Sequence, residues 1–411
     1  MKYLFPVLMA LSGSTLATET LPNLPPTTAV IQVLRAQPLV QAADSQIQVE
    51  TANRKRLEAG NHEWSLRLGG QQRKANPNGS PNERFTEWNA ALESPLRLPG
   101  KAALDAEIGN LGVSLAETAH GDTLHESSRN LLKTWFVWLR ETASATQWRE
   151  QSALLDQQGK ALKRRLQLGD TSRLEQIQAE AAQAQAQAQL AQARTRQRNA
   201  YEDLRRRFPG LPLQEQEIIA APQAIDGTAE TWINVILEHN HELALARGEA
   251  QRAQSLAGRS SRERVPDPTV GVQFSRERSG EENVMGAYIS IPLPGSARLA
   301  ASDASRAQVA VASSREAAVR QRIEAEAAQL HATAVAAIDS WQASRVAAEQ
   351  LTRAAEMTAR SYQLGEGSLS ELLASRRLAN EAALAARLMQ LEALELRYRL
   401  MLDAHRLWDF D

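Results

Sequence analysis

The chain alternates between long stretches with helical periodicity and short stretches in which apolar and polar residues alternate one by one. Two stretches without proline, 101–166 and 297–362, each predict a single helix of roughly 65 residues, about 100 Å long at the helical rise. The pattern also predicts four shorter helices, over 28–58, 172–208, 229–258 and 368–408. In 172–208 the apolar residues recur at coiled-coil spacing, which predicts close packing against neighbouring helices.

One-by-one alternation predicts four strands, at 63–74, 84–96, 268–278 and 283–293. In the first strand Trp64, Leu66 and Leu68 alternate with polar or small residues. Strands of about ten residues cross a bilayer when they are tilted, and such alternation is typical of a membrane barrel. A soluble hairpin shows the same alternation. Because two hairpins alone leave open sheet edges in lipid, these strands require either other chains or a soluble setting.

Several short motifs occur twice, in the same order and at nearly the same spacing. Residues 167–172 return as 363–368, and Glu175 has a counterpart in Glu371. The other pairs are Leu98-Pro99-Gly100 with Leu293-Pro294-Gly295, and Gln37-Pro38-Leu39-Val40 with Asn240-His241-Glu242-Leu243. This duplication predicts two structural repeats, 18–220 and 221–411. Each repeat has a helix, two strands and a long helical hairpin, with its tip at 167–172 or 363–368.

The first residues predict export from the cytoplasm. Met1 and Lys2 precede an apolar run over 3–11, and small residues at Thr15 and Ala17 complete a secretory signal over 1–17. A buried N-terminal strand or helix is the other interpretation. The charges nearly balance, with 47 Lys and Arg against 48 Asp and Glu, so nothing in the net charge favours nucleic acid as a partner. The absence of cysteine excludes disulfides, cysteine-based metal sites and cysteine nucleophiles.

The sequence predicts neither enzyme activity nor a cofactor or metal, because it contains no glycine-rich phosphate loop and no histidines at metal-ligand spacing. His239 and His241 allow a metal interpretation. Histidines two positions apart lie on different faces of a helix, however, which disfavours a shared metal ion unless three chains bring them together. In 171–175 the sequence predicts another helix start, with Ser172 as the N-cap and Glu175 closing a capping box.

Taken together, these features resemble the TolC family of outer-membrane efflux channels over nearly the whole chain. The resemblance rests on the duplication, on the glycine-containing tips, and on three segments, 266–272, 290–294 and 362–373. It implies a mainly α fold with a small β part. In that fold three copies form an α-helical barrel across the periplasm, and each copy gives four strands to a shared twelve-stranded transmembrane β-barrel. It also implies a location in the outer membrane of a Gram-negative cell.

The resemblance implies the function of an exit duct in a tripartite efflux system. The implied partners are two further copies of the chain, a periplasmic adaptor (membrane fusion protein), an inner-membrane pump of the RND type, and outer-membrane lipid. The length and the missing lipid-anchor cysteine resemble the metal-cation branch slightly more than the drug channels. The alternatives are a duct for ATP-driven protein secretion and a soluble periplasmic coiled-coil scaffold.

Two sets of site residues follow from the resemblance. The first is the adaptor-docking tips: Leu168, Gly169, Ser172, Leu364, Gly365 and Ser368. The second is a constriction at the periplasmic end of the pore, formed by Glu175 and Glu371, which places six carboxylates around one axis in a trimer. Ala374 stands where a second acidic residue of the ring can occur in the family. Plain hairpin turns and solvated surface carboxylates are the alternative interpretations.

Overall fold

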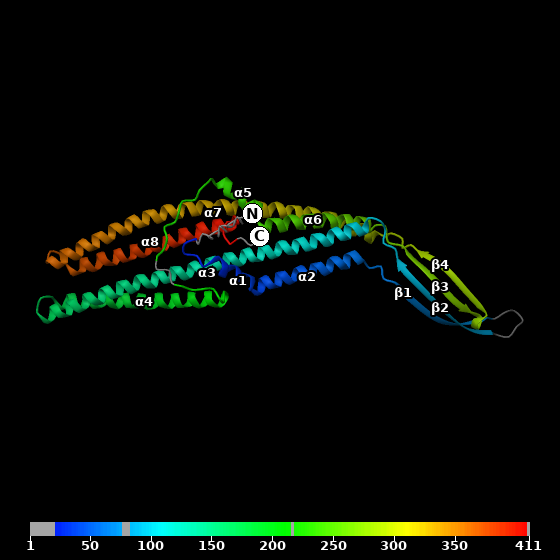
Figure 1. Cartoon of the computed structure of the whole chain (residues 1–411), viewed down its shortest axis with the longest axis horizontal. Coiled ribbons are helices and arrows are strands. Elements are labelled where there is room, and N and C mark those ends of the chain that lie inside the picture. Colours follow the sequence, from blue (N-terminus) through cyan, green and yellow to red (C-terminus); the bar gives the residue numbers. More distant parts are fainter. Residues whose placement is uncertain (1–20, 76–82, 215–217, 409–411) are drawn as a thin grey trace, which may run out of the picture. The chain divides into compact units, whose positions relative to one another are not determined.

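The computed structural model describes residues 21–75, 83–214 and 218–408, so the predicted signal segment 1–17 lies outside the described residues. The order helix, helix, strand, strand, helix, helix occurs twice (Figure 1). The first set is α1 (Thr27–Arg35), α2 (Pro38–Ala59), β1 (Ser65–Ala75), β2 (Glu83–Pro95), α3 (Lys101–Gln167) and α4 (Arg173–Arg207). The second set is α5 (Ala229–His239), α6 (His241–Arg262), β3 (Thr269–Glu277), β4 (Glu282–Ser290), α7 (Ser296–Leu364) and α8 (Leu369–Asp403), with a short 3-10 helix, η1 (Arg278–Gly280), between β3 and β4.

The chain forms two compact units, and each unit takes segments from both sequence repeats. Unit 1 consists of the described residues within Met1–Val33, Trp135–Gln223 and Ser344–Leu391. Unit 2 consists of the described residues within Leu34–Thr134, Ala224–Ala343 and Glu392–Asp411. The units therefore differ from the repeats 18–220 and 221–411. Helices α3, α7 and α8 each contribute residues to both units.

Two predicted helices are wrong as single elements, those over 28–58 and 229–258. A new helix, α2, begins at Pro38, because the residue before a proline is forced out of the helical region and Gln37 is extended. A new helix, α6, also follows Asn240, which is extended and accepts a hydrogen bond from the Leu243 N–H through its side chain (2.8 Å). Both breaks fall on the repeated motif at 37–40 and 240–243. None of the helices in the described part of the chain combines the length and the hydropathy that a membrane-spanning helix requires.

Unit 1 has a core of aromatic side chains near the start of its α3 segment. Trp135 and Trp138 are buried, and their ring centroids lie 5.0 Å apart. The Trp135 indole N–H donates to the carbonyl oxygen of Asn23 (2.8 Å). The Asn23 side chain in turn donates to the Ile218 carbonyl oxygen and accepts from the Ala220 N–H, both at 2.8 Å. These bonds pair the buried polar groups and attach residue 23 and residues 218–220 to the core.

Unit 2 contains an antiparallel sheet with the order β1-β2-β3-β4 (Figure 1). Its strands begin and end within three residues of the predicted ranges, and β4 shows the largest difference because it ends at Ser290, before Pro292. The register places Leu66 opposite Leu92, Leu92 opposite Val272, and Val272 opposite Ala287. The outer edges of β1 and β4 pair with no other strand among the described residues.

A buried ionic network lies where the strands meet the helices of unit 2. Lys101, the first residue of α3, is only 1% exposed. Its ammonium group lies 2.9 Å from the Asp267 carboxylate and 3.3 Å from Glu263, and it donates to the Val265 carbonyl oxygen (2.8 Å). Asp267 also accepts from the Leu98 N–H (3.0 Å). Since both linkers between strands and helices contribute partners, the network fixes how the sheet joins α3 and α6.

We expect Lys101→Met to destabilise unit 2 by about 2 kcal/mol, because Asp267 then loses a buried cationic donor. Lys160→Met is the matched control. Lys160 also pairs with a carboxylate, that of Asp156 (2.6 Å), but its side chain is 73% exposed, so its loss changes stability by at most about 0.5 kcal/mol. Denaturant unfolding followed by tryptophan fluorescence measures both variants. Equal unfolding midpoints for the two variants would contradict this role of Lys101.

Candidate functional site at the hairpin tips and on the sheet

Both hairpin tips begin with the same helix-ending motif. At the end of α3 the Asp170 N–H donates to the Arg165 carbonyl oxygen (2.9 Å) and the Gly169 N–H donates to that of Leu166 (3.0 Å). The equivalent bonds at the end of α7 are Glu366 to Ser361 (3.0 Å) and Gly365 to Tyr362 (3.1 Å). These are the two bonds of a Schellman motif, which requires a left-handed residue. Gly169 and Gly365 supply it with φ values of 77° and 79°.

Both tips end with the same helix-starting motif, as the sequence predicts for 171–175. The Ser172 hydroxyl accepts from the Glu175 N–H (3.2 Å), and the Glu175 carboxylate accepts from the Ser172 N–H (3.3 Å). Ser368 and Glu371 repeat this capping box, at 3.3 Å and 3.1 Å. Glu175 also accepts from the Thr171 hydroxyl. The two carboxylates predicted to line a pore thus hold their own helix starts, a role compatible with the pore role.

The hydrogen bonds that Glu371 receives lower its pKa. The Ser368 N–H is the largest cause, followed by the Ser368 hydroxyl. A carboxyl group whose pKa is lowered in the folded state stabilises that state above its ordinary pKa of 4.5. This contribution is lost as the pH falls through the lowered value, so acid loosens the start of α8.

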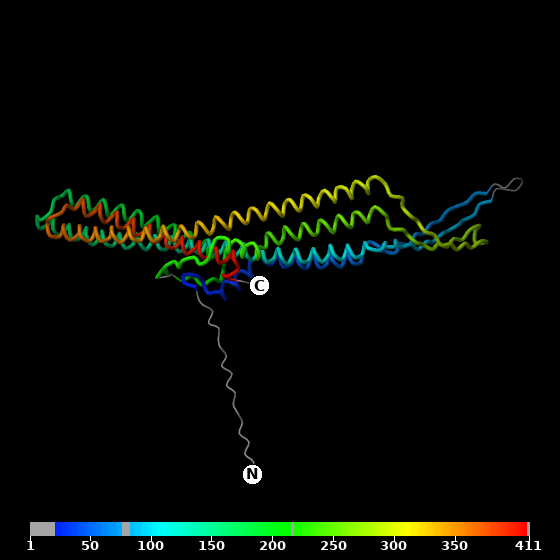
Figure 2. The backbone as a smooth tube through the Cα atoms, turned by 90° about the horizontal axis from the view of Figure 1, so that it is seen from above, coloured from blue at the N-terminus to red at the C-terminus, as the bar shows by residue number. Residues whose placement is uncertain are grey.

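The outermost side chains of the tips are apolar and exposed. Leu168 is 83% exposed and Leu364 is 68% exposed. A Cβ atom added at Gly169 or Gly365 would meet no atom within 4 Å, so the tip surface is open on the glycine side. The structure thus brings the six predicted docking residues into two equivalent surface turns. Figure 2 shows both turns, at 167–172 and 363–368, at the same end of unit 1.

The two hairpins pack against each other just behind their tips. Leu162 of α3, Ala179 of α4, and Leu369 and Leu372 of α8 form one buried cluster. Arg165 adds a polar link, because it binds the Asp170 carboxylate (2.9 Å) and lies over the Tyr362 ring, 5.8 Å from its centroid. Burial, and then the charge of Glu175, raise the pKa of the Tyr362 hydroxyl. The tips are therefore presented as one surface rather than as two independent loops.

A groove of about 540 Å³ begins behind this surface. It lies between α3, α4 and α8, and its lining combines alanine, glutamine and larger apolar side chains with Ser370, Arg377, Asn380 and Glu381. Trp148 and Leu155 come from α3, and Leu373 and Ala374 come from α8. A groove of this composition can accept the apolar face of an amphipathic helix.

The sheet of unit 2 has one apolar face and one polar face. The apolar face carries large exposed side chains from all four strands: Leu66, Leu68, Trp88, Leu92, Val272, Met285 and Ile289. On this face the Trp88 and Phe274 ring centroids lie 5.5 Å apart. So many exposed apolar side chains on one face mark a surface that meets an apolar partner or a membrane.

The polar face is held by ion pairs between strands. Glu93 of β2 accepts from Arg67 of β1 (2.8 Å) and from the Tyr288 hydroxyl of β4 (2.6 Å). Farther along the sheet, Arg73 of β1 binds Glu87 of β2 (3.1 Å) and Glu277 of β3 (2.9 Å). Buried or shared carboxylates of this kind require cationic partners, and each has one. This face can therefore be wet while the other face is in contact with an apolar medium.

The structure corrects the interpretation of His239 and His241. They do not lie on one helix, because Asn240 separates α5 from α6. Instead they lie beside His125 and His405, with ring centroids between 5.0 and 6.1 Å apart. Sequence spacing could not reveal this cluster, because His125 and His405 each lie more than a hundred residues from His239 and His241. Within residues 21–75, 83–214 and 218–408, no three His, Cys, Asp or Glu side chains are placed to hold a metal ion.

No protein-family model and no curated protein sequence matches the chain. Solved structures do match it, over nearly its whole length. CusC, whose crystal structures concern folding and transmembrane channel formation, has a TM-score of 0.75 at 14% identity, covering 92% of this chain and 91% of that chain. The outer membrane channel CmeC of Campylobacter jejuni has a TM-score of 0.73 at 12% identity, covering 93% and 86%. The outer membrane protein VceC of Vibrio cholerae has a TM-score of 0.73 at 15% identity, covering 93% and 95%.

The chain has the TolC-family fold. This result confirms the resemblance seen in the sequence, and it confirms a mainly helical architecture with one small sheet. At these identities the likeness is one of architecture. The tips and the amphipathic sheet therefore belong to a chain whose fold is similar to that of known outer-membrane channels.

We expect Ser172→Ala to lower the free energy of local opening at the start of α4 by about 1 kcal/mol, since the Glu175 N–H loses its acceptor. This corresponds to roughly fivefold lower amide protection of the first turn in hydrogen exchange. Ser172→Asp is the control, because aspartate also accepts at an N-cap and keeps the protection. If Ala and Asp gave the same protection, the cap would not stabilise the tip.

Proposed function

We propose that the chain is the outer-membrane exit duct of a tripartite efflux system. The amphipathic sheet carries this proposal. Its apolar face suits lipid, while its polar face, with Arg67–Glu93 and Arg73–Glu87, suits a water-filled lumen. A soluble periplasmic scaffold gives no reason for exposing so many large apolar side chains on one face of a sheet. The proposed function involves no enzyme activity and no cofactor.

The open edges of β1 and β4 support a trimer. An edge strand in lipid leaves unpaired N–H and C=O groups, each of which costs several kcal/mol. Pairing β1 of one copy with β4 of the next satisfies both edges, and three copies with four strands each close a twelve-stranded barrel. In this arrangement the helices form the proposed tunnel across the periplasm.

The tips are the proposed docking surface for a periplasmic adaptor. Leu168 and Leu364 supply exposed apolar contact, and the open surface at Gly169 and Gly365 allows close approach of another backbone. The adaptor would join the duct to an inner-membrane pump of the RND type, which supplies the energy. We propose metal cations or drugs as the cargo, because the resemblance to the efflux branches covers nearly the whole chain.

Glu175 and Glu371 are the proposed charged ring of the periplasmic opening. Each lies in the first turn of its helix, next to the docking surface, and neither is buried. In a trimer they place six carboxylates around the axis, which favours cations at the opening. The capping boxes hold these carboxylates at fixed positions, so the ring keeps its geometry without further partners.

The docking surface predicts a loss of binding when charge is placed on the tips. We expect Leu168→Glu combined with Leu364→Glu to reduce the adaptor recovered by crosslinking in the native cell about tenfold, since apolar contact is lost. The glycines and caps remain, so the tips keep their shape. Leu39→Glu is the control, because Leu39 is also exposed (73%) but belongs to unit 2. Unchanged recovery with the double variant would remove the tips from the docking surface.

The charged ring predicts a change in ion selectivity. We expect Glu175→Gln combined with Glu371→Gln to shift the channel from cation selectivity toward none, as measured by reversal potentials in planar bilayers. Glutamine also closes a capping box, so this pair removes charge and keeps the helix starts. Glu202→Gln, on the same helix as Glu175 but far from the tip, should leave the reversal potential unchanged. Selectivity that survived the double substitution would place both carboxylates outside the conduction path.

A further inference from the structure

Four histidines meet in unit 2, where the end of α8 contacts α3 and the α5–α6 junction. The His125 and His405 rings are stacked, with centroids 5.4 Å apart and planes 8° from parallel. His405 also lies 5.0 Å from His241 and 5.6 Å from His239. His405 is thus the centre of the cluster and touches all three other elements.

The backbone at His405 is held in an unusual conformation. The Arg406 N–H donates to the Met401 carbonyl oxygen (2.8 Å) and the His405 N–H donates to that of Leu402 (3.0 Å). These are the same two bonds that end α3 and α7 at Gly169 and Gly365. Here, however, the left-handed position is occupied by a histidine, with a φ of 54°. A side chain at such a position is sterically disfavoured and persists only when its surroundings hold it, and three imidazole rings do so here.

His125 is neutral in the ordinary state of the cluster. The Nε2 atom of His125 lies 3.2 Å from the Leu402 carbonyl oxygen, which can only accept, so Nε2 carries the proton. His239 donates in the same way through Nδ1 to the Val235 carbonyl oxygen (3.1 Å). Burial is the largest cause that lowers the pKa of His125 to about 4, and the charge of Arg129 lowers it further. Neutral rings can stack, whereas charged rings repel each other.

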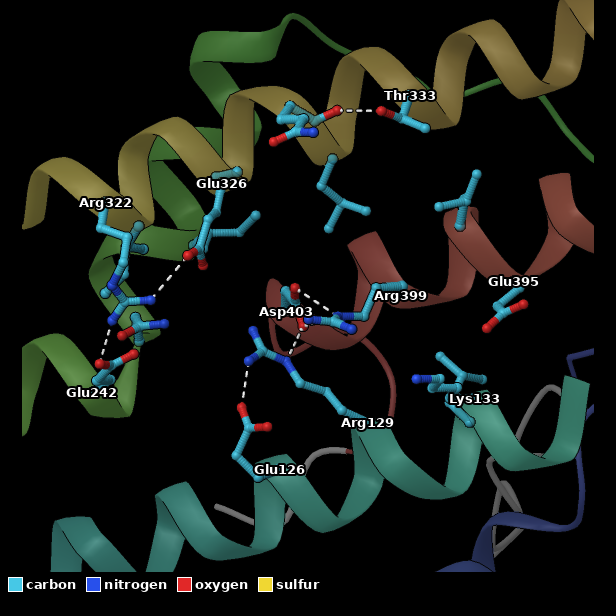
Figure 3. Close-up of a pocket in the computed structure, with 18 residues that line it drawn as sticks. Glu126, Arg129, Lys133, Glu242, Arg322, Glu326, Thr333, Glu395, Arg399 and Asp403 are labelled. Atoms are coloured by element: carbon cyan, nitrogen blue, oxygen red, sulfur yellow. Dashed lines mark hydrogen bonds and ion pairs between the residues drawn. The ribbon is translucent and has the colours of Figure 1, made fainter. Parts of the chain in front are cut away.

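Charged side chains of α3, α6, α7 and α8 lie near the cluster, and several of them line the pocket drawn in Figure 3. Helix α3 carries Asp122, Glu126 and Arg129. Glu242 lies on α6, and Arg322 and Glu326 lie on α7. Arg399 and Asp403 lie on α8, and Arg406 follows its end. Asp403 accepts from Arg129 (2.8 Å) and from Arg399 (3.0 Å), and lies 3.7 Å from His125. Since both arginines already use this carboxylate, it offers little compensation to a histidine that gains a proton. Burial, and then the charges of Glu126 and Glu242, raise the pKa of Asp122. The negative charge of the Asp122 carboxylate is therefore also lost in acid.

We propose that His125, His239, His241 and His405 form a pH-sensitive latch, which holds residues 404–408 onto α3 and the α5–α6 junction at neutral pH and releases them in acid. A proton on His125 places a positive charge 5.4 Å from the His405 ring centroid and 6.1 Å from that of His241, and beside Arg129. The stack then no longer supports the left-handed conformation of His405, and the helix end opens. The latch is a property of the fold and does not rest on the proposed transport function.

The sign and the pH range follow from His125. Its folded-state pKa lies below the ordinary value of 6.5, so its contribution to stability is complete above about pH 6.5. The contribution decreases as the pH falls and is lost through pH 4, because the folded state resists the proton that the unfolded state accepts. The latch should therefore open between these two values.

Hydrogen exchange of the purified full-length protein tests the latch. Protection factors, which are corrected for the intrinsic pH dependence of exchange, are compared for residues 401–408 at about pH 7.5 and about pH 4.5. We expect protection to fall about tenfold or more in acid. The buried α3 segment 131–139 should keep its protection, which separates release of the latch from general acid unfolding. Unchanged protection at 401–408, or parallel loss in both segments, would overturn the proposal.

Substitutions at His125 identify the titrating group. His125→Gln does not titrate, and its side-chain amide can still donate to the Leu402 carbonyl oxygen, so we expect it to abolish the acid response of 401–408. His125→Asn provides a second variant, in case the first alters the fold. His331→Gln, on α7 and outside the cluster, is the control and should respond to acid like the unsubstituted chain. If both cluster variants kept the full acid response, the histidines would not form the latch.

Discussion

The pairing of backbone groups at the edges of one small sheet is the constraint on which the rest of this structure depends. The sheet exposes an apolar face built from all four strands, yet β1 and β4 leave their outer N–H and C=O groups without strand partners in the described chain. In an apolar medium such edges are too costly to leave open. The proposed closure by further copies would satisfy them, and it would also explain why the opposite face carries ion pairs rather than a second apolar layer.

The ends of the helices at the hairpin tips also have backbone N–H and C=O groups that need partners. Each long helix of a hairpin stops at a left-handed glycine, and each return helix starts at a serine whose partner glutamate closes the cap. The two tips therefore reach the same geometry from similar six-residue motifs. The proposed docking surface would benefit from this local rigidity, because little conformational entropy would then be lost on binding. His405 ends α8 with the same bonds but without glycine, which makes that helix end dependent on its neighbours.

Short sequence patterns predicted the elements that depend on residues close together in the chain. The strands follow from alternation, and the capping box follows from Ser172 and Glu175, three residues apart. The breaks at Pro38 and Asn240 were present as a repeated motif, but helical periodicity on both sides of each break concealed them. Features made by distant residues could not be predicted. The Lys101 network and the histidine cluster join segments more than a hundred residues apart, and no spacing in the sequence marks them.

The most direct test of the account is disulfide crosslinking between the two edges of the sheet. The natural chain has no cysteine, so introduced pairs have no background. One cysteine replaces Gln71 on β1, and the second replaces Val284, Gly286 or Tyr288 on β4, all on the polar face. The account predicts covalent dimers and trimers in at least one pair, and no larger species, because the ring closes at three. Folded protein that stays monomeric with all three pairs would contradict it.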